Sequence, residues 1–251
     1  KNIVTVDADT RLVQLNKDFG KHFGISLVGE MDIDNTISFE YYFPYVRSSF
    51  IMNQERIYIE KHGDKESYAG VYNLGMTLIF FLTNISDYTN TKWMNYSNHL
   101  ITKAYMSGLS TSGKVILDIE QLPPANREHK CSSVNRNKLI EAARQGDRSA
   151  MESLTLDDMD IYTQVSRRAH YEDILSIVET NFMPYGIETE HYSIIGNILD
   201  CSLCENDYTK EPVYLLNVET NEMLMAIAIN EKDLLGTPAP GRRFKGEIWL
   251  Q

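Results

Sequence analysis

The sequence predicts an α+β fold with an antiparallel N-terminal β-sheet domain, a helical middle segment and a small C-terminal β-domain. Three observations predict it. Apolar and polar residues alternate at a period of two in residues 1–84, apolar residues recur every three or four positions in 137–186, and strand-like runs return after 187. The polar stretch 123–136, which opens with two prolines, separates the first part from the second. The predicted domains are therefore 1–122, 137–186 and 187–251, with 123–136 as a linker.

The N-terminal part is predicted to be an antiparallel meander. Residues 23–30 alternate at period two, and so do residues 37–45, whose odd positions are Ile37, Phe39, Tyr41, Phe43 and Tyr45. Such alternation predicts that one face of each strand packs and the other is wetter. Residues 76–82 are apolar on both faces, which predicts a central, covered strand. Residues 85–98 follow as a candidate covering helix, and 114–119 as a late strand.

The middle segment is predicted to form several short helices. Leu139 and Ala143 lie on one helical face, and Gly146 suits the left-handed residue that follows a helix end. Asp147 can cap a second short helix. Thr155 opens a capping box, with Asp in place of Glu, and therefore predicts the start of a third helix.

The C-terminal part is predicted to contain four strands, at residues 192–203, 212–218, 223–229 and 243–250. A one-turn helix with Asn230 as its cap lies between the third and fourth strands. Three strands, a short helix and one further strand follow the order of an oligonucleotide/oligosaccharide-binding (OB) barrel that lacks its last strand. The sequence therefore predicts an OB-like but incomplete barrel.

Composition excludes several classes of protein. The chain has 251 residues, a net charge of −11 and a hydrophobic content of 43%, which is enough for a substantial core. No apolar run reaches the length of a membrane span, and three cysteines do not make a disulfide scaffold. The chain opens at Lys1 inside a strand-like run, so we expect its natural start to lie upstream. Cysteine usage predicts a soluble, cytoplasmic protein without membrane contact.

Two cysteines at a spacing of three, Cys201 and Cys204, are one candidate for a metal site. With His129 and Cys131 they would supply four ligands for zinc. On a regular strand, however, residues three apart point to opposite faces, and His129 and Cys131 lie in the predicted linker. We therefore predict ordinary thiols, with no metal and no cofactor.

A charged loop offers one candidate catalytic site. His62 lies among carboxylates, with Glu60 and Glu66 nearby, and such a group can act as a general base. The alternative is a solvated loop between two strands. The common phosphate-binding, metalloprotease and serine-hydrolase motifs are absent. We predict no catalytic residues, and keep an enzyme that uses Glu60, His62 and Glu66 as an alternative.

Basic and aromatic residues alternate near residue 245 and form the candidate binding site. Its members are Arg242, Arg243, Phe244, Lys245 and Trp249. Single-stranded nucleic acid is held by such a combination of stacking rings and phosphate contacts. The competing interpretation is that Phe244 faces a core while Arg243 and Lys245 are solvated. The acidity of this third of the chain favours the second interpretation, because phosphate affinity needs local positive charge.

Four blocks together resemble a known family: residues 41–45 (YYFPY), 59–71, 135–147 and 233–251. The family is a bacterial one from anaerobic Firmicutes, catalogued as a domain of unknown function. The resemblance spans nearly the whole chain and implies a bacterial cytosolic protein. It transfers no activity, cofactor or catalytic residue.

The function that the sequence favours is non-enzymatic binding or scaffolding, through contacts with an unidentified protein or small ligand. The absence of catalytic motifs motivates this hypothesis. Single-strand nucleic-acid binding by the C-terminal β-domain is the second alternative, and the acidic balance of the chain argues against it. The sequence leaves the oligomeric state open.

Overall fold

A computed structural model describes residues 2–5, 11–49, 51–52, 57–62, 67–71, 77–94, 100–101, 104–117, 139, 142–143, 145–170 and 174–251. The chain divides into two compact units. The first comprises Lys1–Val71, Thr77–Leu117 and Thr180–Gln251, and the second comprises Tyr72–Met76 and Asp118–Glu179. The described part is mostly β, and the helical middle is a smaller share of it than the α+β prediction implies.

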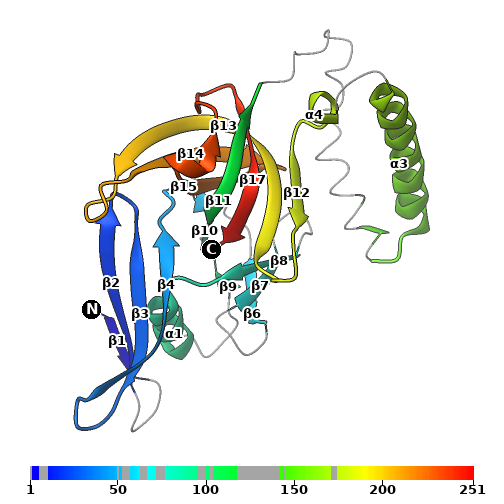
Figure 1. The fold of residues 1–251 in the computed structure, drawn as a ribbon. Coiled ribbons are helices and arrows are strands. Elements are labelled where there is room, and N and C mark those ends of the chain that lie inside the picture. Colours follow the sequence, from blue (N-terminus) through cyan, green and yellow to red (C-terminus); the bar gives the residue numbers. More distant parts are fainter. Residues whose placement is uncertain are drawn as a thin grey trace. The chain divides into compact units, whose positions relative to one another are not determined.

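Among the described residues, the strands and the helix α1 lie in the first unit (Figure 1). Its N-terminal half holds β1 (Asn2–Thr5), β2 (Arg11–Gly20), β3 (Phe23–Met31), β4 (Ile37–Val46), β5 (Ile51–Met52), β6 (Ile57–Lys61), β7 (Ser67–Val71), β8 (Thr77–Phe81), α1 (Ile85–Met94), β9 (Leu100–Ile101), β10 (Ala104–Tyr105) and β11 (Ser107–Ile116). Its C-terminal part holds β12 (Asn181–Pro184), β13 (His191–Glu205), β14 (Pro212–Thr220), β15 (Met223–Asn230), the 3-10 helix η2 (Glu231–Asp233), β16 (Leu234–Leu235) and β17 (Arg243–Leu250).

The antiparallel N-terminal sheet is confirmed: β1, β2, β3 and β4 pair in sequence order. Its inner face packs on a core of Val28, Phe43, Tyr45, Phe81 and Ile85. The last two come from β8 and α1, so the predicted helix after residue 85 does cover the sheet, as Figure 1 shows beside β4. Inside this contact the fully buried side chain of Gln14 makes four hydrogen bonds, two of them to Ser86 of α1.

A β-bulge in β4 changes the predicted alternation. Val28 pairs with Tyr41 whereas Gly29 pairs with Phe39, so Glu40 is an extra residue. The expectation that all odd positions of 37–45 share one face is therefore wrong: Phe39 is exposed, while Tyr41 and the odd positions after it face inward. Gly29 makes the bulge possible, because a Cβ there would lie 2.3 Å from the carbonyl oxygen of Ser38.

The C-terminal strands form part of a closed barrel. β13 pairs with β14, β14 with β15, β15 with β11, β11 with β17, and β17 with β13. Of these five strand pairs, the β11–β15 pair is parallel and the other four are antiparallel. The predicted barrel was incomplete; in the structure β11, which comes from the N-terminal half of the chain, fills the place of the last strand. The four predicted strands and the Asn230 cap are confirmed.

Alternate residues of these strands fill the barrel. They are at most 2% exposed and include Ile194, Ile198, Leu216, Val218, Met223, Met225, Ile227, Ile229, Phe244, Ile248 and Leu250. Gly113 of β11 leaves room for the largest of them, because a Cβ there would lie 2.5 Å from the ring of Phe244. A small residue on the closing strand thus allows one aromatic ring to fill this part of the interior.

Gln251 joins the barrel to the N-terminal sheet. Its backbone exchanges two hydrogen bonds with Ser107 of β11, at 2.8 and 2.9 Å. Its side-chain amide donates to the carbonyl of Pro44 (2.8 Å) and accepts from the backbone N–H of Val46 (3.0 Å), both on β4. The hydroxyl of Ser107 donates to the carbonyl of Val46 (2.8 Å). Gln251, Ser107 and Val46 are buried, so most of this joint is shielded from water, whereas Pro44 is exposed.

A smaller sheet has the order β8-β7-β6-β9. The prediction that residues 76–82 form a central strand is wrong, because β8 lies at the edge of this sheet. At the open edge of β8, the backbone groups of Ile79 bond to Tyr192 of β13. The Tyr192 hydroxyl accepts from the N–H of Ile79 and donates to its carbonyl. A side chain thus replaces the neighbouring strand that an apolar edge would otherwise need.

The second unit contains α3 (Arg148–Ala169) and α4 (Ile174–Ile177) among its described residues. Asp147 caps α3 as predicted, since its carboxylate accepts from the N–H groups of Ser149 and Ala150. The predicted break at Thr155 is wrong. The Thr155 hydroxyl donates to the carbonyl of Met151 one turn earlier, a bond that a threonine inside a helix makes, and the helix continues. Neither described helix here, nor α1, is long and apolar enough to cross a membrane.

Replacing Gln251 by Ala should destabilise the whole first unit. The change leaves the buried N–H of Val46 and the carbonyl of Pro44, an exposed residue, without their partner, and a buried unpaired group costs about 1–3 kcal/mol. We expect the free energy of unfolding in urea to fall by about 1–3 kcal/mol. Gln145→Ala, at an exposed turn, is the matched control and should change it by less than about 0.5 kcal/mol. Equal effects of the two substitutions would contradict the role given to Gln251.

Candidate binding surface

The structure places the predicted basic and aromatic residues in different environments. Phe244 is fully buried inside the barrel, and Arg243 is 3% exposed with its Nε donating to the carbonyl of Leu117 (3.0 Å). Arg242 is exposed and donates to the carbonyl of Thr237 (2.7 Å). Phe244 therefore faces the core, as the competing interpretation predicts, but Arg243 is buried rather than solvated.

Trp249 leaves β17 on the outer side of the barrel, where its ring lies 4.9 Å from that of Phe81 and packs against the core beneath the N-terminal sheet. Lys245 is half-buried on the same side of β17 and pairs in register with Lys114 of β11. Both predicted stacking rings are thus in contact with the protein itself. The structure does not bring the five predicted residues together as one surface.

The alternative polar site is described only in part. Glu60 and His62 are exposed, and they lie two residues apart at the end of β6, so their side chains leave the same side of the strand. The backbone N–H of His62 donates to the carbonyl of Ser67 (2.7 Å). Glu66 lies outside the described residues, and the three-residue site therefore stays a prediction.

The two C-terminal cysteines have different surroundings. Cys204 packs against the core that contains Phe23, whereas the sulfur of Cys201 contacts the carbonyl of Pro238 at 3.6 Å. In the part of the chain that the structure describes, no three His, Cys, Asp or Glu side chains gather as metal ligands would. His129 and Cys131 lie outside that part.

The outer side of the barrel is covered along β14 and β15. Leu215, Ala226 and Ala228 point away from the interior and form a buried cluster with Phe23 and Val46 of the N-terminal sheet. The small alanine side chains allow this close approach. The loop between β13 and β14 is held as well: Asp207 donates from its backbone to the carbonyl of Phe19 (2.7 Å), and the rings of Phe19 and Tyr208 meet edge to face.

In the described part of the first unit, the face of the N-terminal sheet opposite to α1 carries several exposed apolar side chains. We call it the outer sheet face. Its members are Leu15 on β2, Ile25 and Leu27 on β3, and Phe39, Tyr42 and Pro44 on β4. Leu27 is 37% exposed, Phe39 54% and Tyr42 69%. These three are large apolar side chains in contact with water.

The strand register makes the outer sheet face continuous. Leu27 lies directly between Leu15 and Tyr42 on the neighbouring strands, and Ile25 lies opposite Pro44 in the next row. Directly opposed residues of an antiparallel pair have Cβ atoms about 5 Å apart, so these side chains touch across the strands. The β4 bulge adds Phe39 to the same face, because without the extra Glu40 either Phe39 or Tyr42 would point inward.

The middle of β3 places apolar side chains on its wetter face. Gly24, Ser26 and Val28 are buried on the inner face, while on the other face Ile25 is half-buried and Leu27 is exposed. An antiparallel sheet with one wet face normally turns polar side chains to water. Here the polar Ser26 lies on the buried face instead, where it bonds Gln14 and Asn16. Sequence alternation located these residues but could not tell which set would be exposed.

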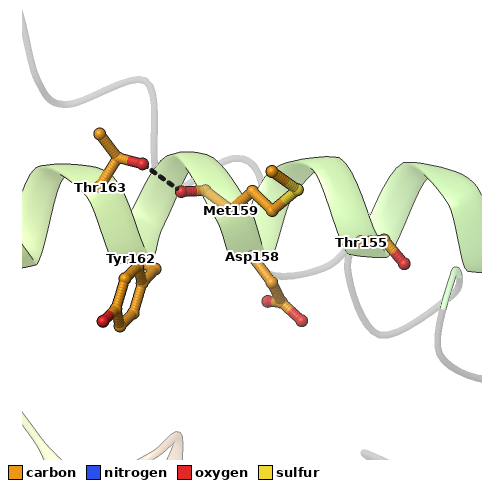
Figure 2. A pocket seen from close by; sticks show the side chains of 5 residues that line it. All are labelled: Thr155, Asp158, Met159, Tyr162 and Thr163. Carbon is orange, nitrogen blue, oxygen red and sulfur yellow. Dashed lines mark hydrogen bonds between the residues drawn. The ribbon is translucent and has the colours of Figure 1, made fainter.

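The helix α3 carries a second set of exposed apolar side chains. Met151, Leu156, Met159 and Tyr162 are each more than half exposed. Figure 2 shows Met159 and Tyr162 around a shallow hollow together with Asp158, Thr155 and Thr163, all from this single helix. A hollow lined by one helix offers no converging polar groups for a small ligand.

A polar cluster fixes the end of the N-terminal sheet. Tyr45 donates to the carboxylate of Asp18, and Arg47 lies 3.0 Å from the same carboxylate with its guanidinium over the Tyr45 ring. The hydrogen bond from Tyr45, aided by the charge of Arg47, holds the pKa of Asp18 below its usual value. Burial and the hydrogen bond to Asp18 raise the pKa of Tyr45 to about 12.

The fold and surface together define a β-rich protein with a closed barrel and an attached sheet whose apolar face is open. The chain belongs to the family described as "Domain of unknown function, E. rectale Gene description (DUF3881)", whose model matches residues 1–251. The resemblance inferred from the sequence is therefore confirmed. No curated protein matches the chain, and no solved structure matches it.

The raised pKa of Tyr45 predicts a loss of stability in alkali. A folded-state pKa of about 12, against about 10 unfolded, gives a contribution that is complete below pH 10 and disappears as the pH rises toward 12. Because Asp18 and Arg47 are half exposed, we discount the full linkage energy and expect about 1–2 kcal/mol.

The measurement compares wild type with Tyr45→Phe by urea unfolding at pH values of about 9 and 11.5. Between these values the wild type should lose about 1–2 kcal/mol more than the variant. Parallel losses in the two proteins would show that Tyr45 does not titrate in this way.

Proposed function

We propose that this protein is a non-enzymatic binding or scaffold protein, and that its contact surface is the outer sheet face. The observation that carries the proposal is the burial pattern in the middle of β3, which buries Ser26, leaves Ile25 half-buried and exposes Leu27 next to Tyr42. Contiguous apolar patches on a folded surface mark contacts with other molecules, because leaving them in water is unfavourable.

The shape of the surface favours a macromolecular partner over a small ligand. The outer sheet face is built from neighbouring strands of one sheet, and its exposed residues are spread over three strands. Small molecules bind in concave sites that bury most of their surface, with a few polar groups to orient them. An apolar face that includes the ring and hydroxyl of Tyr42 matches the core of a protein interface instead.

We also infer that the barrel is of the OB type with its last strand supplied from upstream. An OB barrel joins strands in the order 1-2-3-5-4-1, and assigning β13, β14, β15, β17 and β11 as strands 1 to 5 reproduces this order, with the 3-10 helix between strands 3 and 4. OB barrels hold ligands on the strand 2–3 face and on the loop between strands 1 and 2. Here Phe23 and Val46 cover the strand 2–3 face, and Phe19 contacts the loop between strands 1 and 2. We therefore propose that the barrel has a structural role and supports the N-terminal sheet.

The covered barrel face predicts that the intact protein does not bind single-stranded DNA. Fluorescence anisotropy of a labelled oligothymidylate of about 20 nucleotides, at about 20 mM NaCl, should stay unchanged up to micromolar protein. A known single-strand-binding protein serves as the positive control. Binding that weakens with added salt and is lost in Lys245→Glu would instead revive the nucleic-acid alternative.

The proposed contact can be trapped in cells. A photoreactive benzoylphenylalanine at position 42, in the middle of the outer sheet face, should form discrete protein adducts on irradiation. The matched control places the same residue at position 187, where Ile187 is fully exposed outside this face and should give few or none.

The adducts at position 42 should also disappear when Leu27→Lys is added, because a charged ammonium cannot be buried against an apolar partner without a large cost. Equal labelling at positions 42 and 187, or adducts that persist with Leu27→Lys, would contradict the proposal. A defined turnover abolished by His62→Ala would favour the enzyme alternative.

A further inference from the structure

We propose that Lys114 and Lys245 form an anion site on the outer side of the barrel, and that its ligand is a doubly charged phosphate group. The site lies on β11 and β17, whereas the outer sheet face lies on β2, β3 and β4, so the inference goes beyond the proposed function. Two observations carry it. The two lysines are directly opposed, and neither ammonium group has a partner among the described residues.

The opposition of the two lysines follows from the strand register. Lys114 pairs with Lys245 across antiparallel β11 and β17. The neighbouring pair, Gly113 and Gly246, faces the barrel interior, because a Cβ at either glycine would meet the ring of Phe244. Both lysines therefore point outward, with Cβ atoms about 5 Å apart, and like charges in such a pair destabilise a sheet. An anion between the two ammonium groups would replace this repulsion by attraction.

No described carboxylate is bonded to this pair. Neither ammonium group takes part in an ion pair or a hydrogen bond in the part of the chain that the structure describes. The next residue on the same face of β17 is Glu247, and its carboxylate already accepts a hydrogen bond from Tyr185. In the other direction the next residue on this face is a third cation, Arg243. In a chain with a net charge of −11, the two lysines therefore form a local positive site.

The closing strand of the barrel creates this site. The acidity of the last third of the chain argues against phosphate binding when that third is taken alone. Lys114 comes from the first half of the chain and reaches Lys245 because β11 closes the barrel. Two ammonium groups balance the charge of one phosphate dianion, whose oxygens suit point charges of this kind. A nucleic-acid strand fits less well, because the rings of Phe244 and Trp249 are in contact with the protein itself.

Titration of the isotope-labelled full chain with inorganic phosphate, followed by amide NMR shifts, tests the site. At about pH 8 the phosphate carries close to two charges, and we expect a Kd on the order of 1 mM because water screens surface lysines. The amide signals of Lys114 and Lys245 should shift and saturate, whereas that of Lys21, an exposed lysine in the turn between β2 and β3, should not. No shift at either site residue, or equal shifts at all three lysines, would overturn the inference.

Related anions identify the ligand class. Dimethyl phosphate carries one charge, so it should bind at least about threefold more weakly than inorganic phosphate. Phenyl phosphate separates the two sources of a doubly charged group. An affinity equal to that of inorganic phosphate identifies the free anion, and a tighter one identifies a phosphate ester. Binding of the oligothymidylate at micromolar protein, with no shift caused by phosphate, would assign these lysines to nucleic acid and contradict the proposal.

Charge-removing variants give a second, independent test. Without phosphate, Lys114→Gln and Lys245→Gln should each melt about 1–3 °C above the wild type, because the repulsion is relieved. With about 10 mM phosphate, the wild type should gain about 3–5 °C more than either variant. Lys21→Gln is the matched control and should respond as the wild type does, since the general stabilisation by phosphate acts on every variant. Equal gains in the wild type and both site variants would sink the proposal.

Discussion

The pairing of β11 with the C-terminal strands is the constraint on which the rest of the first unit depends. β11 lies between β15 and β17, and without it the barrel would have two open edges. Where β11 begins, Ser107 and Gln251 hold each other and β4 in one buried hydrogen-bonded joint. The barrel and the N-terminal sheet are therefore parts of one structure, although residues 118–179 of the second unit lie between β11 and β12 in the chain.

This joint also decides which surfaces are available. It fixes β4 beside the barrel, and Phe23 and Val46 then cover β14 and β15 where an OB barrel would hold its ligand. The inner face of the same sheet is occupied by α1 and β8. The rows around Leu27 lie beyond the end of the sheet that Phe23 and Val46 pack against the barrel, and on the face opposite to α1. This position explains why the outer sheet face is exposed.

Local features of the fold were predictable from the sequence, because they depend on neighbouring residues. The C-terminal strands, the Asn230 cap and the Asp147 cap follow from alternation and from side chains that accept backbone N–H groups. Residues 114–119 were predicted as a strand, and β11 covers part of that range, but its place in the barrel was not predictable, because Ser107 pairs with Gln251 and no local pattern indicates a partner so far along the chain. The bulge at Glu40 was not predictable for a related reason, because a bulge depends on the register of the opposite strand.

The candidate surface shows the same limit. Leu27 and Tyr42 were visible as apolar positions, but their exposure follows from Gln14 and Ser26 bonding across the inner face, which needs α1 in place. In the basic and aromatic stretch, alternation alone allowed Phe244 to face either the core or a ligand. The glycine at position 113, which opens space for that ring, comes from a strand that sequence analysis did not assign to the barrel.

The origin of β11 has a consequence for how the chain reaches its fold. Arg243 and Leu117, which share a hydrogen bond, are 126 positions apart, so the strands that flank β11 are synthesised long after it. Until then β11 has two unpaired edges, and the loop that must close around it is long. The N-terminal meander, whose strands pair in sequence order, can form first and hold β11 near Val46. Folding of the first unit should therefore have a fast, local stage and a slow stage that waits for β15 and β17.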